Sequence, residues 1–242
     1  MRVTVAIPAY NEVTNLERVV DESLREIERA TTDGDAEVLV VDDGSRDGTS
    51  ALADELARRH PSVRVFHHGT NRGFSGAMTT CFRESRGDWI FLIPADGQTR
   101  PAELPRFLEK ASDADIVVGI RGSRADHAGR KVLSRGFHFI ARSLLGIRLR
   151  EFSSVFLFRR ALLDAMPFRS RPNGATLLPE ILFRADQRGA RFATVTVAQF
   201  ARLSGEPKGG RPMVAIVSLI ELFRLAVLVR MDELRKVRRA EV

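Results

Sequence analysis

GDWIFLIPADGQ, residues 87–98, is an apolar run that ends abruptly in an acidic turn containing a glycine. A continuous apolar run is typical of an interior strand in a parallel sheet. Open α/β sheets bind their ligands at the carboxyl ends of such strands, where this turn would lie. Asp96 and Gln98 could supply oxygen ligands to a hard divalent cation. An ordinary strand-to-loop turn explains this segment, taken alone, equally well.

Strand and helix signals alternate along the chain. Short apolar runs predict strands, and apolar residues at helical spacing predict the helices between them. Such alternation indicates an α/β fold with right-handed crossovers and a mostly parallel sheet. The predicted strands are 3–7, 37–41, 63–66, 89–93, 116–119 and 191–198, and the predicted helices are 15–30, 49–59, 76–84, 102–110 and 179–187.

Two further segments are amphipathic. Residues 133–145 carry one apolar helical stripe opposite a cationic face, and residues 213–229 are strongly apolar but contain Glu221 and Arg224. A spanning helix needs about 20 mostly apolar residues, so 213–229 is predicted to be interfacial or core-packed. Both segments fit a surface helix packed on the core, or a helix lying in a membrane interface.

Size and composition set the broad class. The 242 residues, 44% of them hydrophobic, can bury a full core, which predicts one domain at 1–211 and an amphipathic, basic helical extension at 212–242. The single cysteine, Cys81, excludes an intramolecular disulfide and a cysteine-built zinc site. The N-terminus has no signal-peptide profile, which favours the cytoplasm. The net charge of +7 predicts an anionic partner, and without zinc-finger or RNA-binding signatures we expect no nucleic acid.

Polar turns follow several of the predicted strands and would meet at one edge of the sheet. Tyr10 could lie beside a base, and Glu12 or Asp42 could accept hydrogen bonds from ribose hydroxyls or base nitrogens. Neither a Gly-x-Gly-x-x-Gly motif after the first strand nor a Walker lysine is present, so a metal ion at Asp96 would fill the need for phosphate neutralisation. The turns are PAYNE at 8–12, DDGSRDGT at 42–49 and the turn at Asp96.

Four segments in this order and spacing resemble the motifs of the family-2 glycosyltransferases with the GT-A fold. They are PAYNE at 8–12, VVDDGSRDGT at 40–49, NRGFSGA at 71–77 and ADGQ at 95–98. The chain resembles in particular the branch of dolichyl-phosphate mannose synthases and polyprenyl-phosphate glycosyltransferases, over roughly residues 3–210. The resemblance implies a Rossmann-like α/β/α sandwich with a mostly parallel central sheet, followed here by the amphipathic C-terminal helical segment.

The resemblance also implies a GDP- or UDP-sugar donor, with Mg²⁺ or Mn²⁺ held by Asp96 and Gln98 against the diphosphate. Asp96 would be catalytic, because the ion would neutralise charge on the departing nucleoside diphosphate. Arg202 and Lys208 lie in a segment similar to the family's loop over the donor phosphates. The implied nucleotide-sugar contacts are Pro8, Tyr10, Glu12, Asp42, Asp43, Asn71, Gly73, Asp96, Arg202 and Lys208.

The acidic motif departs from the family in one position. The family usually begins this motif with an aspartate, and this chain has Pro94 there. Asp96, Gln98 and two diphosphate oxygens would still support octahedral Mg²⁺ completed by water. Residues 153–160 also lack a glycine and an upstream aspartate that the family typically has. A nucleotide-sugar-binding protein with impaired catalysis is therefore an alternative.

A lipid monophosphate is already anionic and can attack the sugar without a general base, whereas a hydroxyl acceptor requires one. The basic segment 121–134 resembles the one that family members place beside the acceptor phosphate, and we predict Arg121 and Arg130 as its catalytic arginines. For a hydroxyl acceptor the candidate bases are Glu180 and Asp126. The predicted acceptor-binding residues are Arg121, Arg124, Arg130, Ser134 and Glu180.

The leading hypothesis is an inverting, metal-assisted glycosyltransferase. It would transfer a sugar from a GDP- or UDP-sugar to a polyprenyl phosphate, acting as a peripheral protein on the anionic, cytoplasmic face of the membrane. The alternatives are a soluble saccharide or other hydroxyl acceptor, and the impaired binding protein. The sequence leaves open the sugar, the nucleotide, the acceptor and the oligomeric state, a homo-oligomer included.

Overall fold

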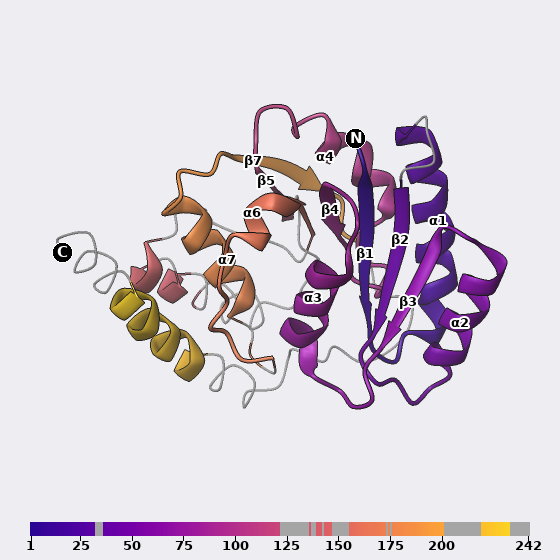
Figure 1. Ribbon diagram of the computed structural model, residues 1–242, viewed down its shortest axis with the longest axis horizontal. Coiled ribbons are helices and arrows are strands. Elements are labelled where there is room, and N and C mark those ends of the chain that lie inside the picture. The colour runs from indigo at the N-terminus through magenta and orange to yellow at the C-terminus, as the bar shows by residue number, and fades with distance from the viewer. Residues whose placement is uncertain are drawn as a thin grey trace.

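A seven-stranded sheet forms the centre of the part of the chain that the structure describes, with helices on both sides (Figure 1). The computed structural model describes residues 1–31, 36–121, 136, 139–141, 143–146, 155–172, 174, 176–200 and 219–232. The strand order is β3-β2-β1-β4-β6-β5-β7, and every neighbouring pair is parallel except those that β6 makes with β4 and β5. The strands are β1 Val3–Ala9, β2 Ala36–Asp42, β3 Val63–His67, β4 Trp89–Leu92, β5 Ile116–Arg121, β6 Phe156–Arg159 and β7 Phe192–Val197.

The helices cover the two faces of the sheet and enclose two separate apolar cores. One core lies between the sheet and α1, α2 and α4, and the other between the sheet and α3, α6, α7 and a helix at 219–232. Neighbouring residues of β4 point to opposite cores, Ile90 to the second and Phe91 to the first, as the pleat of a strand requires. This confirms the α/β/α sandwich. The helices are α1 Val13–Ala30, α2 Thr49–Arg59, α3 Gly73–Glu84, η1 Pro101–Glu103, α4 Leu104–Leu108, α6 Arg160–Asp164 and α7 Leu177–Asp186.

The predicted strands and helices of the parallel part are all present, with small differences at their ends. Helix α3 begins at Gly73 rather than at residue 76. Gly73 has φ +76°, and its backbone N–H donates to Asn71 Oδ1 at 3.1 Å, so the polar turn before the apolar residues already belongs to the helix start. The sequence pattern marks where the apolar face begins, which is one turn later.

The structure contains strand β6, which the sequence pattern did not predict. It runs antiparallel between β4 and β5, and Phe156 and Phe158 stack in the second core with ring centroids 5.1 Å apart while Leu157 enters the first core. The strand is only four residues long, and its three apolar residues face both cores, so it lacks the alternation that identifies a half-buried strand. The sheet is therefore mostly parallel, with one antiparallel insertion near its centre.

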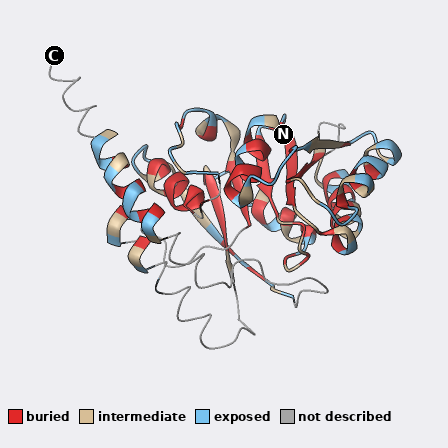
Figure 2. Cartoon of the chain, turned by 90° about the horizontal axis from the view of Figure 1, so that it is seen from below, coloured by how far each residue is buried: buried red, intermediate tan, exposed pale blue. Residues whose placement is uncertain are grey.

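The helix at 219–232 packs on the second core and also exposes an apolar face. Its buried side includes Leu222, Leu225, Ala226 and Val229, and Figure 2 shows burial changing from face to face along it. On the outer side Ile220, Phe223 and Val227 are 62%, 54% and 58% exposed. Within the described ranges, no helix combines the length and hydropathy needed to cross a membrane. The segments 201–218 and 233–242 lie outside the described residues, so the boundary at 211/212 stays a prediction.

Candidate functional site

A pocket of about 410 Å³ lies at the carboxyl ends of β2 and β3, within the size range of small-ligand sites. The first two predicted motifs and the start of the third contribute to its lining. Its walls include Tyr10, Asp42, Arg46, His67, His68 and Asn71.

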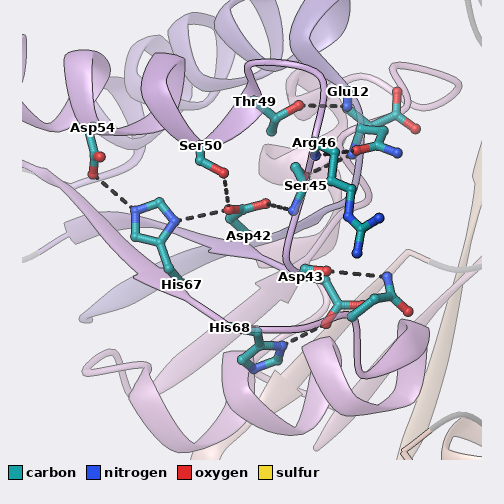
Figure 3. A network of polar contacts seen from close by, with 12 residues as sticks. Glu12, Asp42, Asp43, Ser45, Arg46, Thr49, Ser50, Asp54, His67 and His68 are labelled. Atoms are coloured by element: carbon teal, nitrogen blue, oxygen red, sulfur yellow. Dashed lines mark hydrogen bonds and ion pairs between the residues drawn. The ribbon is translucent and has the colours of Figure 1, made fainter.

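Asp42 forms the base of this pocket, at the last position of β2, and Figure 3 shows the network around it. Its Oδ2 accepts hydrogen bonds from Ser50 Oγ at 2.6 Å and from His67 Nδ1 at 3.0 Å, and its Oδ1 accepts one from the Ser45 backbone N–H at 3.1 Å. Burial alone would raise the pKa of Asp42, but hydrogen bonds from Ser45, Ser50 and His67 outweigh it and lower the pKa below its usual value. Asp42 is thus a fixed anion in the pocket.

His67 bridges Asp42 and Asp54. Its Nδ1 lies 3.0 Å from Asp42 Oδ2, and its Nε2 lies 3.0 Å from Asp54 Oδ1. Burial would lower the pKa of His67, but the hydrogen bonds to the two carboxylates dominate and raise it. With an acceptor at each ring nitrogen, the charged imidazolium is the form that can donate to both. The sequence-based prediction missed this residue, although its position at the end of β3 was a signal.

The second and third motifs are joined at Asp43. Its Oδ1 accepts a hydrogen bond from the Arg72 backbone N–H at 2.8 Å and contacts His68 Nδ1 at 2.6 Å. The other ring nitrogen of His68 lies 2.9 Å from Thr80 Oγ1, and Asn71 Nδ2 donates to the Asp43 carbonyl at 3.2 Å. His68 is therefore a second residue that the sequence-based prediction missed, and it orients the predicted residue Asp43.

The first motif joins the second through its own turn. Asn11 has φ +52°, its backbone N–H donates to Ser45 Oγ at 2.9 Å, and its Oδ1 accepts from the Arg46 backbone N–H at 2.8 Å. The Glu12 backbone N–H donates to Thr49 Oγ1 at 2.9 Å. The structure thus brings the predicted residues of these turns to one edge of the sheet.

The acidic turn lies beside the first motif. The Ala95 backbone N–H donates to the Pro8 carbonyl at 3.3 Å, and Asp96 Oδ1 accepts from the Gln98 backbone N–H at 3.0 Å. Gly97 has φ +67°, and the guanidinium of Arg18 occupies the space that a Cβ would need. These contacts fix the backbone of the turn and hold the carboxylate of Asp96 toward its own loop.

The donor set of this turn can be compared with the needs of a metal ion. Among the described residues, no group of three or more His, Cys, Asp and Glu side chains is placed to hold a metal. Asp96 and Gln98 offer two oxygen ligands, and Mg²⁺ is commonly held by one or two carboxylates together with substrate phosphates and water. The residues therefore fit an ion that binds with a diphosphate rather than one held by the protein alone.

Phe200, which precedes Arg202 and Lys208 in the sequence, contacts the acidic turn and the residues after it. The Phe200 backbone N–H donates to the Gln98 carbonyl at 2.8 Å, and the guanidinium carbon of Arg100 lies 4.6 Å from the centre of the Phe200 ring. Arg202 and Lys208 themselves lie outside the described residues.

The predicted acceptor side is described only in part. Arg121 ends β5, where its backbone pairs with Val197, while Arg124, Arg130 and Ser134 lie outside the described residues. Glu180 is fully buried, and its carboxylate accepts hydrogen bonds from the backbone N–H groups of residues 169 and 170 and from Arg184 Nε, each at 2.8 Å. In this arrangement Glu180 organises the protein interior and has no exposed face for a sugar or acceptor.

Known proteins with similar sequences act on polyprenyl phosphates. The chain is 34% identical over 233 residues to the undecaprenyl-phosphate mannosyltransferase of Micrococcus luteus, covering 90% of this chain and 93% of that one. It is 34% identical over 212 residues to the undecaprenyl-phosphate 4-deoxy-4-formamido-L-arabinose transferase of Pseudomonas aeruginosa, with 85% of this chain and 60% of that one covered. The dolichol-phosphate mannosyltransferase of Pyrococcus furiosus is 31% identical over 221 residues. The chain spans about 60% of the length of these last two relatives.

Solved structures share the fold. The glucosyl-3-phosphoglycerate synthase of Mycobacterium tuberculosis, in complex with Mn²⁺, UDP and glucosyl-3-phosphoglycerate, superposes with a TM-score of 0.69 at 21% identity, covering 93% of this chain and 80% of that one. A mannosyltransferase from Pyrobaculum calidifontis in complex with GDP-mannose and Mn²⁺ gives 0.64 at 23% identity, covering 93% and 64%. The model of the family named glycosyl transferase family 2 matches residues 4–170. The chain therefore belongs to glycosyl transferase family 2 and is a glycosyltransferase with the GT-A fold.

Proposed function

We propose that this protein transfers one sugar, with inversion, from a GDP- or UDP-sugar to a polyprenyl phosphate. The observation that carries the proposal is that the first three motifs meet at one pocket, and that the turn at Asp96 is hydrogen-bonded to the first of them. The acceptor class is supported by the relatives named above, which act on undecaprenyl or dolichol phosphate.

The donor would lie across the carboxyl edge of β1, β2 and β4. We assign Tyr10, Asp42 and Glu12 to the nucleoside, because they surround or adjoin the pocket beside β2. The other proposed contacts to the donor follow the motifs that meet there: Pro8, Asp43, Asn71, Gly73, Asp96, Arg202 and Lys208.

Asp96 and Gln98 are the proposed ligands of Mg²⁺ or Mn²⁺. An ion bound there would neutralise negative charge on the leaving nucleoside diphosphate. The hydrogen bond from the Gln98 backbone N–H to Asp96 Oδ1 holds the carboxylate in one orientation before any ligand binds, which lowers the entropic cost of binding. Pro94 has no side-chain oxygen, so the diphosphate would supply a larger share of the coordination than with an aspartate there.

A phosphate acceptor is favoured over a hydroxyl acceptor by the surroundings of Glu180. A hydroxyl acceptor needs a general base, and Glu180 is one of the two candidates. Its carboxylate is buried and already accepts hydrogen bonds from Arg184 and two backbone N–H groups. A phosphate monoester instead needs cations, and we assign this role to Arg121 and Arg130, supported by Arg124 and Ser134.

The same reaction requires access to a lipid, and the helix at 219–232 supports a peripheral position on the cytoplasmic face of the membrane. Ile220, Phe223 and Val227 form an exposed apolar stripe, with Arg224 and Arg230 exposed beside it. Apolar residues next to cations are typical of helices that lie in a lipid interface, and each cation adds about 1 kcal/mol near an anionic leaflet.

Labelled GDP- and UDP-sugars, incubated with the purified protein, a polyprenyl phosphate in vesicles and Mg²⁺ or Mn²⁺, test the proposal. We expect labelled glycolipid from one donor. Product formed only on saccharides or other soluble acceptors would overturn the lipid assignment, and donor binding without any transfer would indicate an impaired binding protein.

The metal assignment has its own test. Asp96→Asn should remove the metal-dependent part of the thermal stabilisation by GDP or UDP. Asp88→Asn is the control, because Asp88 is exposed and pairs with Arg2 at the opposite end of the sheet. If the metal still enhances nucleotide stabilisation in Asp96→Asn, Asp96 is not a ligand.

A further inference from the structure

A connecting segment, residues 168–172, 174 and 176, lies between the helix at 219–232 and the donor pocket. On the helix side, Arg171 Nη1 lies 3.1 Å from Glu221 Oε1, and Arg169 Nε lies 3.5 Å from Asp232 Oδ2. Glu221 also pairs with Arg224 of its own helix at 3.2 Å. The two acidic residues sit near opposite ends of the helix, so both ends are attached to the connecting segment.

The opposite side of the connecting segment holds the first turn of α3. The Gly76 backbone N–H donates to the Pro172 carbonyl at 3.0 Å, and Ser75 Oγ donates to the Gly174 carbonyl. A Cβ on Gly76 would lie 3.1 Å from Pro172 Cβ and 3.7 Å from Pro172 Cα, so the connecting segment passes close to the start of α3. A displacement of the connecting segment therefore moves the start of α3.

The start of α3 is in turn attached to the donor pocket. The backbone N–H of Arg72, the residue before α3, donates to Asp43 Oδ1 at 2.8 Å. Asp43 directly follows β2 and joins the motifs that surround the pocket. Ion pairs, short stretches of backbone and hydrogen bonds thus connect Glu221 and Asp232 through the connecting segment to Asp43.

A buried ionic cluster makes the helix end of this path rigid. Glu180 and Arg184 are 0% and 2% exposed and are joined at 2.8 Å, and Arg184 Nη2 lies 3.3 Å from Asp232 Oδ2. Glu180 also binds the backbone N–H groups of Arg169 and Ser170. Buried ionic contacts tolerate little displacement, because a separated charge leaves its partner unpaired in the interior. The helix, α7 and the connecting segment therefore keep one relative arrangement.

We infer that the helix at 219–232 positions the donor pocket through the connecting segment, with Glu221 and Asp232 as positioning residues for donor binding. The inference rests on the proposed function only in that a nucleotide occupies the pocket whose walls Asp43 joins. Because coupling between two sites is reciprocal, a bound nucleotide must also stabilise the contacts of the helix. The helix then does more than attach the protein to a surface, since its contacts set the affinity for the donor.

Substitution of the two positioning residues gives the first test. Glu221→Gln and Asp232→Asn should each weaken the binding of GDP or UDP about five- to tenfold, within the usual range of coupling between sites. The donor KM should rise equally, while kcat at saturating donor stays within about twofold, because neither residue touches the reacting atoms. Asp88→Asn removes an exposed pair at 3.1 Å from the opposite edge of the sheet and should leave both constants unchanged.

Amide hydrogen exchange gives a second test that does not depend on activity. In the wild-type protein, GDP or UDP with Mg²⁺ should slow exchange in 219–232 and in the connecting segment, and Glu221→Gln should abolish the effect in the helix. If nucleotide binding leaves exchange in the helix unchanged and both variants bind with wild-type affinity, this inference is wrong while the proposed function still stands. If neither nucleotide binds the wild-type protein, the proposed function fails with it.

Discussion

Gly44→Ala tests whether the pocket depends on close backbone contact between the second and third motifs. Gly44 has φ +71°, and a Cβ there would lie 2.8 Å from the backbone nitrogen of Asn71 and 2.8 Å from the carbonyl carbon of Thr70. Both neighbours are backbone atoms, so they cannot move aside by a change of rotamer. The added methyl group must push the chain before α3 away from β2.

The expected cost has two parts. A left-handed conformation costs a residue with a Cβ about 1–2 kcal/mol, and forcing an extra carbon against fixed atoms costs about 1–3 kcal/mol. Together they destabilise the protein by about 3 kcal/mol. In a chain of this size that lowers Tm by roughly 6–12 °C. The displacement should also disturb the hydrogen bond from Asn71 Nδ2 to the Asp43 carbonyl, and with it nucleotide binding.

Gly189→Ala is the matched control. Gly189 has φ +70°, and a Cβ there would meet no atom within 4 Å, so only the conformational cost of about 1–2 kcal/mol applies. Urea unfolding followed by circular dichroism gives both free energies, and thermal shift with GDP and UDP gives binding. Equal destabilisation by the two substitutions, or unchanged nucleotide binding in Gly44→Ala, would refute the contact argument.

Three further predictions concern titration, buried charge and thiol reactivity. The pKa of His67 is raised in the folded state, so the contacts of the protonated ring with Asp42 and Asp54 stabilise the fold fully below about pH 6.5. This stabilisation is lost as the pH rises through the folded-state pKa. The stability difference between wild type and His67→Asn, measured by thermal unfolding, should therefore be larger at pH 6 than at pH 9; an equal difference would exclude a charged His67. Arg184→Met leaves buried Glu180 without its cation and should cost about 3–5 kcal/mol in urea unfolding. Arg160→Met, which breaks an exposed pair at 3.5 Å, should cost at most about 1 kcal/mol, and similar losses would contradict the buried-pair argument. Burial raises the pKa of the Cys81 thiol, so a thiol reagent at pH 8 should label it only after unfolding, and rapid labelling of the native protein would disprove its burial.

Much of the fold could be predicted because its strands are apolar runs bounded by turns. Residues 3–7, 38–41 and 89–93 are buried on both sides of the sheet, so their composition alone identifies them as interior strands. Strand β6 was not predicted because its three apolar residues, followed by Arg159, are too few to show a periodicity. Its place between β4 and β5 depends on long-range pairing, which is absent from the local pattern.

The site could be predicted to the level of its turns but not to the level of its contacts. Asp42 and Asp43 stand out in the sequence, whereas His67 and His68 gain their roles only when β3 lies beside β2. The sequence led us to expect Glu180 at the acceptor, and its partner Arg184 follows four residues later on the same helix face. That spacing allows a pair but does not reveal whether the pair is buried, because burial depends on Asp232 and the helix that carries it.

The antiparallel direction of β6 has a consequence for how acceptor preference can change. Because β5 ends and β6 begins at the same edge, the Gly119 N–H donates to the Val155 carbonyl at 2.9 Å, and both ends of the stretch 122–154 are tied at one point of the sheet. A change of length between these two points need not rethread a strand or alter the donor motifs, provided that Ala141 and Leu145, which lie in the second core, are kept. We therefore expect the proposed acceptor-binding residues of this stretch to vary more freely among relatives than the proposed donor-binding residues on the sheet.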